Sequence, residues 1–73
     1  MGQITVKAEV AGRVCALPLA VGAAVDAGDD LAVIEAMKME IPVAAPRAGV
    51  VGAILVAEKQ MVAEGEVLAV LDG

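Results

Sequence analysis

One lysine stands between two methionines in the run Glu35-Ala36-Met37-Lys38-Met39-Glu40. A lysine amine can act as a nucleophile or carry a covalent group. The rest of the 73-residue chain offers few reactive side chains, because it has no His and a single Cys. We therefore expect any chemistry of this protein to involve Lys38, and we expect no metal site and no catalytic residue elsewhere in the chain.

The composition of the chain excludes several kinds of partner. Its formal net charge is -5, whereas a nucleic-acid-binding domain needs a concentrated basic surface. Without Phe, Tyr or Trp it also has no platform on which bases could stack. We expect no nucleic-acid partner, and we expect a monomer that its acidic surface keeps soluble.

The apolar segments and the cysteine do not indicate a membrane protein or a secreted one. The longest apolar stretch, Val14 to Val25, contains Pro18 and Gly22 and is too short to cross a bilayer. The N-terminal residues lack the basic and apolar regions of a signal peptide. Cys15 has no second cysteine for an intramolecular disulfide. We expect a cytoplasmic protein in which Cys15 is a small, semi-buried side chain.

The chain matches itself when it is shifted by 37 residues. The matched pairs include Ala11-Gly12 with Ala48-Gly49, Gly28 with Gly65, and Leu31-Ala32-Val33 with Leu68-Ala69-Val70. Neither half could bury its own apolar face. The repeat therefore predicts a single domain, 1–73, in which two similar halves, about 1–37 and 38–73, pack on one core.

Each half has the pattern of β-strands. From Gln3 to Val10 polar and apolar residues alternate, and segments 31–34, 49–56 and 67–71 are short, apolar and bounded by turn residues. A helix over 31–39 is the alternative, but Pro42 follows it and the matching segment 67–71 is too short for a helix. We predict an all-β fold, a flattened antiparallel barrel or sandwich of about eight short strands (a barrel-sandwich hybrid).

The repeat also predicts where Lys38 lies. Under the 37-residue shift it aligns with Met1, so it falls at the junction of the two copies. If each copy begins and ends in a strand, the residues Ala36 to Met39 form a tight hairpin turn. The termini would then lie at the opposite pole, and Lys38 would project into solvent. An ordinary charged turn residue could occupy the same place.

The run from Glu35 to Met39 resembles the attachment sequence of biotinyl carrier domains, commonly written (E/S)-A/S-M-K-M. The continuation Met39-Glu40-Ile41-Pro42-Val43 is most similar to small, free-standing bacterial biotin/lipoyl attachment proteins. The resemblance covers nearly the whole chain, since the surrounding residues also match the pattern of these domains: Leu19-x-x-Gly22-x-x-Val25-x-x-Gly28-x-x-Leu31 and Ala45-Pro46-x-Ala48-Gly49-Val50-Val51.

This resemblance implies that a biotin protein ligase joins biotin to Lys38 through an amide, using biotinyl-AMP. A free lysine amine is protonated at neutral pH, so the ligase would have to deprotonate it. The chain would then be a biotin carboxyl carrier that shuttles a carboxyl group between biotin carboxylase and carboxyltransferase sites. Catalysis would belong to those partners, and the chain alone would not be an enzyme.

The resemblance also implies recognition roles for the neighbouring residues. Glu35 and Glu40 would supply charges to the ligase and partner enzymes, while Ala36, Met37 and Met39 would supply small or flexible apolar surface. Solvated carboxylates at the strand ends and methionines that pack the hairpin are the structural alternatives.

Two other functions stay open from the sequence alone. Lipoyl carriers of 2-oxoacid dehydrogenases or the glycine cleavage system share the expected fold, although they usually have Asp-Lys-Ala at the turn. An unmodified β-barrel adaptor could instead dock on partners through its sheet surface. The chain also departs from the family at Lys59, where a Gly is usual. If the backbone there has positive φ, Lys59 is strained by about 1 kcal/mol.

Overall fold

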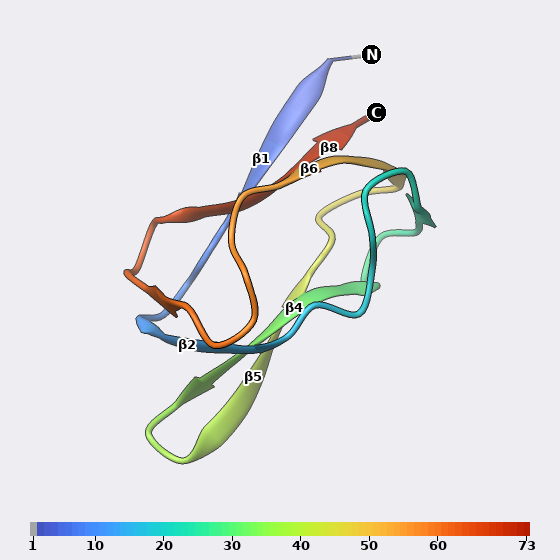
Figure 1. Cartoon of the computed structure of the whole chain (residues 1–73). Helices are drawn as coiled ribbons and strands as arrows, with labels where there is room; N and C mark the ends of the chain where they lie inside the picture. Colours follow the sequence, from blue (N-terminus) through green and yellow to red (C-terminus); the bar gives the residue numbers. More distant parts are fainter. Residues whose placement is uncertain (1) are drawn as a thin grey trace.

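The computed structural model describes residues 2–73, whose regular elements are all strands (Figure 1). No helix capable of crossing a membrane occurs in this part of the chain. The predicted all-β fold is therefore confirmed, and the helix considered over 31–39 is a strand followed by a turn. In chain order the strands are β1 (Gln3–Lys7), β2 (Gly12–Ala16), β3 (Ala24–Val25), β4 (Asp30–Ala36), β5 (Met39–Ala44), β6 (Gly49–Ile54), β7 (Met61–Val62) and β8 (Val67–Asp72).

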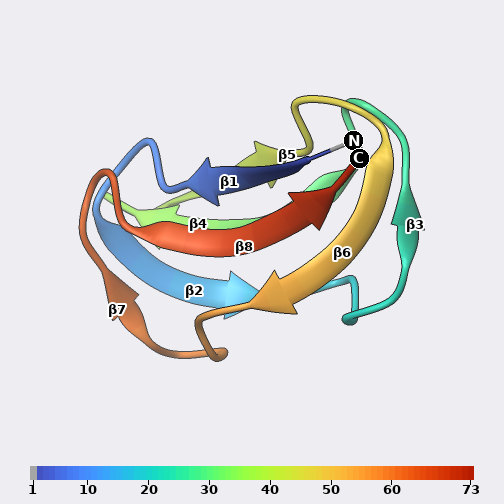
Figure 2. The same ribbon diagram turned by 90° about the horizontal axis from the view of Figure 1, so that it is seen from above.

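The strands form two antiparallel four-stranded sheets, with the orders β1-β8-β6-β3 and β5-β4-β2-β7. Moving each strand by 37 residues converts the first order into the second, because β1, β2, β3 and β4 then fall on β5, β6, β7 and β8. Each sheet contains two strands from residues 1–37 and two from 38–73. Figure 2 shows the strands curving around one core, with the short strands β3 and β7 on opposite flanks. Neither half forms a sheet by itself.

The core between the sheets consists of small aliphatic side chains. No polar or charged side chain is buried among residues 2–73. The largest fully buried side chains are Ile34, Leu68, Leu71, Val14 and Val51. Two pairs of this set, Val14 with Val51 and Ile34 with Leu71, are related by the 37-residue shift. Equivalent positions of the two halves therefore meet in a single thin core.

One strand is shorter than the sequence pattern predicts. The alternation that starts at Gln3 continues to Val10, but β1 ends at Lys7. Ala8 leaves the ladder, because its N–H donates to the carbonyl oxygen of Glu66 (2.9 Å) and its own carbonyl accepts from the Gly65 N–H (2.8 Å). Pro42 lies inside β5 and does not interrupt it. Because β5 is at the edge of its sheet and pairs only with β4, its backbone N–H groups do not have to pair with a second strand, and the missing N–H of Pro42 is tolerated.

Two equivalent turns, at Gly22 and Lys59, differ in their strain. The Gly22 N–H donates to the carbonyl oxygen of Val51 (2.7 Å), and the Lys59 N–H donates to that of Val14 (2.6 Å). Both residues have positive φ, 96° at Gly22 and 74° at Lys59. The left-handed region costs an L-residue about 1–2 kcal/mol, while glycine adopts it freely. The strain that the sequence suggested for Lys59 is therefore present.

Replacing Lys59 with glycine should stabilise the protein. Relief of the strain exceeds the extra entropy that glycine has in the unfolded chain, so we expect a gain of about 0.5–1 kcal/mol in the free energy of unfolding. Thermal unfolding should show a midpoint raised by a few degrees. Lys59→Ala is the matched control, because it removes the charge and keeps the strain. An equal gain in both variants would show that the charge, not the backbone, is unfavourable.

The molecule is elongated, with principal extents of 36 × 17 × 17 Å. The β4–β5 hairpin extends from one end of the long axis, and the two chain ends lie at the other (Figure 1). There the Gly2 carbonyl oxygen accepts hydrogen bonds from the Gly73 N–H (3.1 Å) and from Nη2 of Arg47 (3.3 Å). The hairpin therefore projects from the pole opposite the termini, where the repeat placed it.

Candidate functional site

The loop of the β4–β5 hairpin consists of two residues, Met37 and Lys38. Ala36 and Met39 pair directly across the strands, so this is a two-residue loop, the commonest tight connection of a β-hairpin. The φ angles are 51° at Met37 and 64° at Lys38. Two positive values are the pattern of a type I′ turn, whose twist matches that of the flanking strands. Such turns favour Asn-Gly, so this one keeps two long side chains at a cost in backbone strain.

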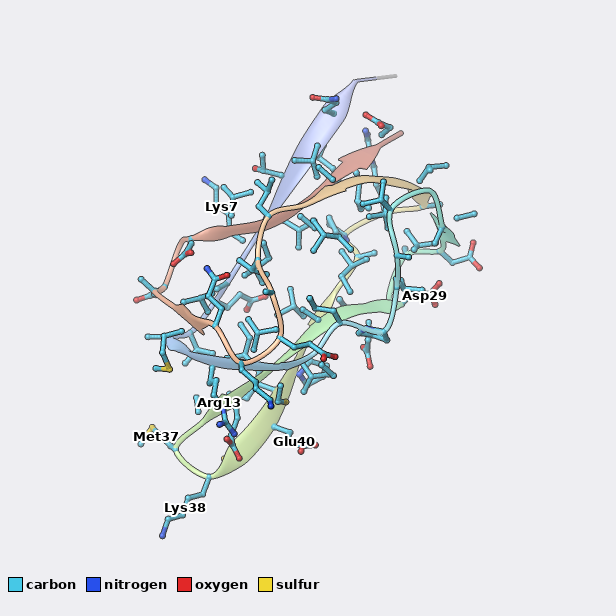
Figure 3. The ribbon with its side chains drawn as sticks, in the orientation of Figure 1. Lys7, Arg13, Asp29, Met37, Lys38 and Glu40 are labelled. Atoms are coloured by element: carbon cyan, nitrogen blue, oxygen red, sulfur yellow. The ribbon has the colours of Figure 1, made fainter. Side chains whose placement is uncertain are left out.

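Lys38 lies at the tip of this turn and points away from the barrel (Figure 3). Its side chain is exposed and has neither an ion pair nor a hydrogen bond within residues 2–73. Met37 beside it is 92% exposed. The geometry therefore presents one amine and one thioether to solvent at the far end of the long axis.

The two faces of the hairpin differ in chemistry. Successive residues of a strand point to opposite faces, and directly paired residues share a face. One face has the pair Ala36 and Met39, and along β5 it continues through Ile41 to the buried Val43. Ala36 is buried, whereas Met39 is 63% exposed. Met39 thus prolongs the core-facing apolar stripe of β5 beyond the core and toward the turn.

The opposite face of the hairpin is charged. Glu35 and Glu40 are direct cross-strand partners, and both are exposed. Arg13 on β2 pairs with Glu35 from the other side, and its Nη2 lies 2.8 Å from Oε1 of Glu35. The two side chains are 50% and 44% exposed, so the ion pair contributes at most about 1 kcal/mol to stability. Figure 3 shows Arg13 at the base of the hairpin.

Sequence reasoning placed Lys38 and its five predicted neighbours correctly on one hairpin, but it missed Arg13. Arg13 is 22 residues from Glu35, and only the pairing of β2 with β4 brings them together. The preceding Gly12 permits that approach. A Cβ on Gly12 would lie 2.5 Å from the carbonyl oxygen of Glu35 and 2.7 Å from Cγ2 of Ile34. The matched glycines of the repeat, Gly12 and Gly49, are therefore the feature of the sequence that could have indicated this close contact.

The site has no enclosed space. Residues 2–73 contain no pocket and no group of three or more side chains that could hold a metal ion. Cys15 is half-buried on β2. The exposed tip of the hairpin can present a group that is attached to Lys38.

Comparison with known proteins gives consistent matches over almost the whole chain. Residues 5–71 match the family Biotin_lipoyl, which is described as "Biotin-requiring enzyme". The "Biotin/lipoyl attachment protein" of Bacillus subtilis is 37% identical over 65 residues, which make up 89% of each protein. The "Biotinylated protein TB7.3 homolog" of Mycobacterium leprae is 36% identical over 66 residues, 90% of this chain and 93% of that protein.

Two solved structures have the same fold at clear sequence similarity. One is a single-chain, multi-domain long-chain acyl-CoA carboxylase, with a TM-score of 0.90 and 39% identity over 94% of this chain. The other is the urea carboxylase of Kluyveromyces lactis, with a TM-score of 0.93 and 38% identity over 99% of this chain. The chain spans only 7% and 6% of the length of these two proteins. With a family match over residues 5–71 and relatives of similar length, this chain belongs to the Biotin_lipoyl family.

Proposed function

We propose that Lys38 is the site of covalent biotin attachment and that the chain is a biotin carboxyl carrier. A carrier of this kind moves a carboxyl group between a biotin carboxylase site and a carboxyltransferase site. The observation that carries the proposal is Lys38 at the tip of a Met-Lys-Met hairpin, exposed and without an ion pair or hydrogen bond among residues 2–73. The catalytic groups belong to the partner enzymes, and this chain supplies the support.

The residues around Lys38 suit a covalently attached group better than a ligand that is bound without a covalent bond. An amide formed by Lys38 would remove the charge of an amine that has no ion-pair partner within residues 2–73, so no interaction in this structure would be lost. Met37 and Met39 lie beside it as flexible apolar side chains suited to several contact surfaces. When biotin is attached, its ureido ring supplies the nitrogen that accepts and releases the carboxyl group.

The chain's own residues orient the lysine and do not activate it. The side chain nearest in the turn is a methionine, and the carboxylates of Glu35 and Glu40 lie on the outer hairpin face, one residue beyond the pair that closes the turn. Deprotonation of the amine therefore falls to the ligase. The antiparallel sheet holds the tip, so Lys38 is offered to each enzyme in one geometry, while the tether keeps the local concentration of the group high.

The comparisons support a carboxylase context without assigning a reaction. The two similar structures are an acyl-CoA carboxylase and a urea carboxylase, and these accept different substrates. The name of the Bacillus relative includes both biotin and lipoyl attachment. The Met-Lys-Met turn favours biotin over lipoate.

Mass analysis of the modified chain tests the proposal. The chain is incubated with biotin protein ligase, biotin and ATP, and in parallel with lipoate ligase, lipoate and ATP. We expect one biotin adduct per chain, retention on avidin, and a modified peptide that contains Lys38. A lipoyl adduct without a biotin adduct would contradict the assignment of the cofactor. An unmodified Lys38 under both conditions would favour the adaptor function.

A further inference from the structure

A row of four side chains crosses the outer face of the β5-β4-β2-β7 sheet just below the Lys38 turn. The strand register pairs Met61 with Arg13, Arg13 with Glu35, and Glu35 with Glu40. Directly paired residues lie on the same face of a sheet. All four are exposed, and Met61 is 68% exposed. Read across the sheet, the row is apolar, cationic, anionic and anionic.

The two carboxylates of this row are in different electrostatic states. Like charges that face each other across paired strands repel, so Glu35 and Glu40 destabilise each other unless one is neutralised. Arg13 neutralises Glu35 through the 2.8 Å ion pair and restricts its rotamer. Glu40 has no ion pair and no side-chain hydrogen bond within residues 2–73. It is the carboxylate of the hairpin that remains available.

The corresponding row at the other pole lacks this arrangement. The 37-residue shift replaces Arg13, Glu35 and Glu40 by Val50, Asp72 and Gln3, which are paired in the same order on β6, β8 and β1. Within residues 2–73 that row has a single charge and no ion pair. The paired cation and anion beside a free anion therefore distinguish the pole that has the lysine.

We propose that Glu40 is the carboxylate through which the biotin protein ligase recognises the hairpin, and that Arg13 is a positioning residue that withdraws Glu35 from this role. The inference rests on the proposed attachment of biotin to Lys38. A cationic side chain of the ligase that approached Glu35 would compete with an existing ion pair and would meet the positive charge of Arg13. The same cation at Glu40 displaces only water.

The ligase surface that this row fits has a defined chemistry. It needs a Lys or Arg opposite Glu40, close to the place where the ligase receives the Lys38 amine. It must leave room for the guanidinium of Arg13, which lies two strands from Glu40. Complementary charges at the edge of a contact mainly raise the rate of association and are screened by salt. The effect should therefore appear in KM and in the salt dependence, with kcat less affected.

Steady-state rates of biotin incorporation test the role of Glu40. They are measured with biotin protein ligase, biotin and ATP over a range of chain concentrations, at low and high salt. Glu40→Gln should lower kcat/KM about tenfold, chiefly through KM, and should remove most of the salt dependence. Glu35→Gln should stay within about twofold of the wild type. Asp72→Asn, the same charge change at the opposite pole, is the matched control and should have no effect.

Arg13 is tested in the same assay. Arg13→Ala frees Glu35, which should raise kcat/KM at low salt about twofold or more and steepen the salt dependence. Adding Glu35→Gln should cancel this gain, and Arg13→Lys should restore wild-type behaviour. The melting midpoint should shift by only a few degrees in each variant, because the residues are exposed.

The outcomes separate this inference from the function on which it rests. If the wild type is not biotinylated, both fail. If the wild type is biotinylated but Glu35→Gln loses as much activity as Glu40→Gln, the assignment of the recognition carboxylate is wrong. If freeing Glu35 by Arg13→Ala leaves the salt dependence unchanged, the positioning role of Arg13 is wrong.

Discussion

The Lys38→Arg variant should lose all biotin incorporation and keep its fold. A guanidinium stays protonated at any pH at which proteins are stable, so it cannot form the amide that the lysine amine forms. The side chain at position 38 is exposed and has no partner within residues 2–73, and arginine retains the positive charge. We therefore expect a change of no more than about 0.5 kcal/mol in the free energy of unfolding.

Avidin blotting and intact mass after treatment with biotin ligase measure this loss, and thermal unfolding measures the fold. The chain provides two matched controls, Lys7→Arg and Lys59→Arg, which change the other lysines in the same way. Both should be biotinylated at the wild-type rate. Persistent labelling of Lys38→Arg, together with loss in either control, would move the attachment site to another lysine.

The sequence contained enough information to predict the fold class, because the pattern of the strands is local. Apolar segments of four to eight residues between turn residues predicted strands at β4, β6 and β8, and these strands are present. The position of the Lys38 turn followed from the repeat, since it falls at the junction of the two copies. Both inferences needed only neighbours in sequence or the comparison of the chain with itself.

The pairing between strands could not be predicted in the same way. The repeat does not determine whether each half forms its own sheet or contributes strands to both, and the second arrangement is the one observed. The ion pair of Arg13 with Glu35 depends on that choice, because it joins β2 to β4. Within β5, by contrast, the local alternation of a strand puts Met39 on the core-facing side and Glu40 on the outer side.

The shared core has a consequence for stability. Ile34 and Leu71 are equivalent under the 37-residue shift, and both side chains are fully buried. Ile34 belongs to the strand that leads to the Lys38 turn, and Leu71 belongs to the strand that ends beside the termini. Since each sheet takes strands from both halves, loss of packing at either position should weaken the whole domain.

Ile34→Ala and Leu71→Ala should each lower the free energy of unfolding by about 2–5 kcal/mol. At about 0.05–0.15 kcal/mol per residue, a 73-residue domain has only about 4–11 kcal/mol in total. Either truncation should therefore lower the melting midpoint by about 10 °C or more, or leave the domain largely unfolded at 37 °C. Denaturant unfolding followed by circular dichroism measures both effects, and Val50→Ala, which alters a residue 42% exposed, should cost far less.

The form of the transition is as informative as its midpoint. If the interleaved halves fold as one unit, both variants should unfold in a single transition. Chains that have passed through this transition should no longer be biotinylated. Leu71→Ala should then impair the presentation of Lys38 although it lies toward the opposite pole. A second transition in Leu71→Ala, with the β4–β5 hairpin still protected from hydrogen exchange, would mean that the hairpin is stable on its own. In that case the sheet would support Lys38 only locally, and the shared core would not be what holds the turn in place.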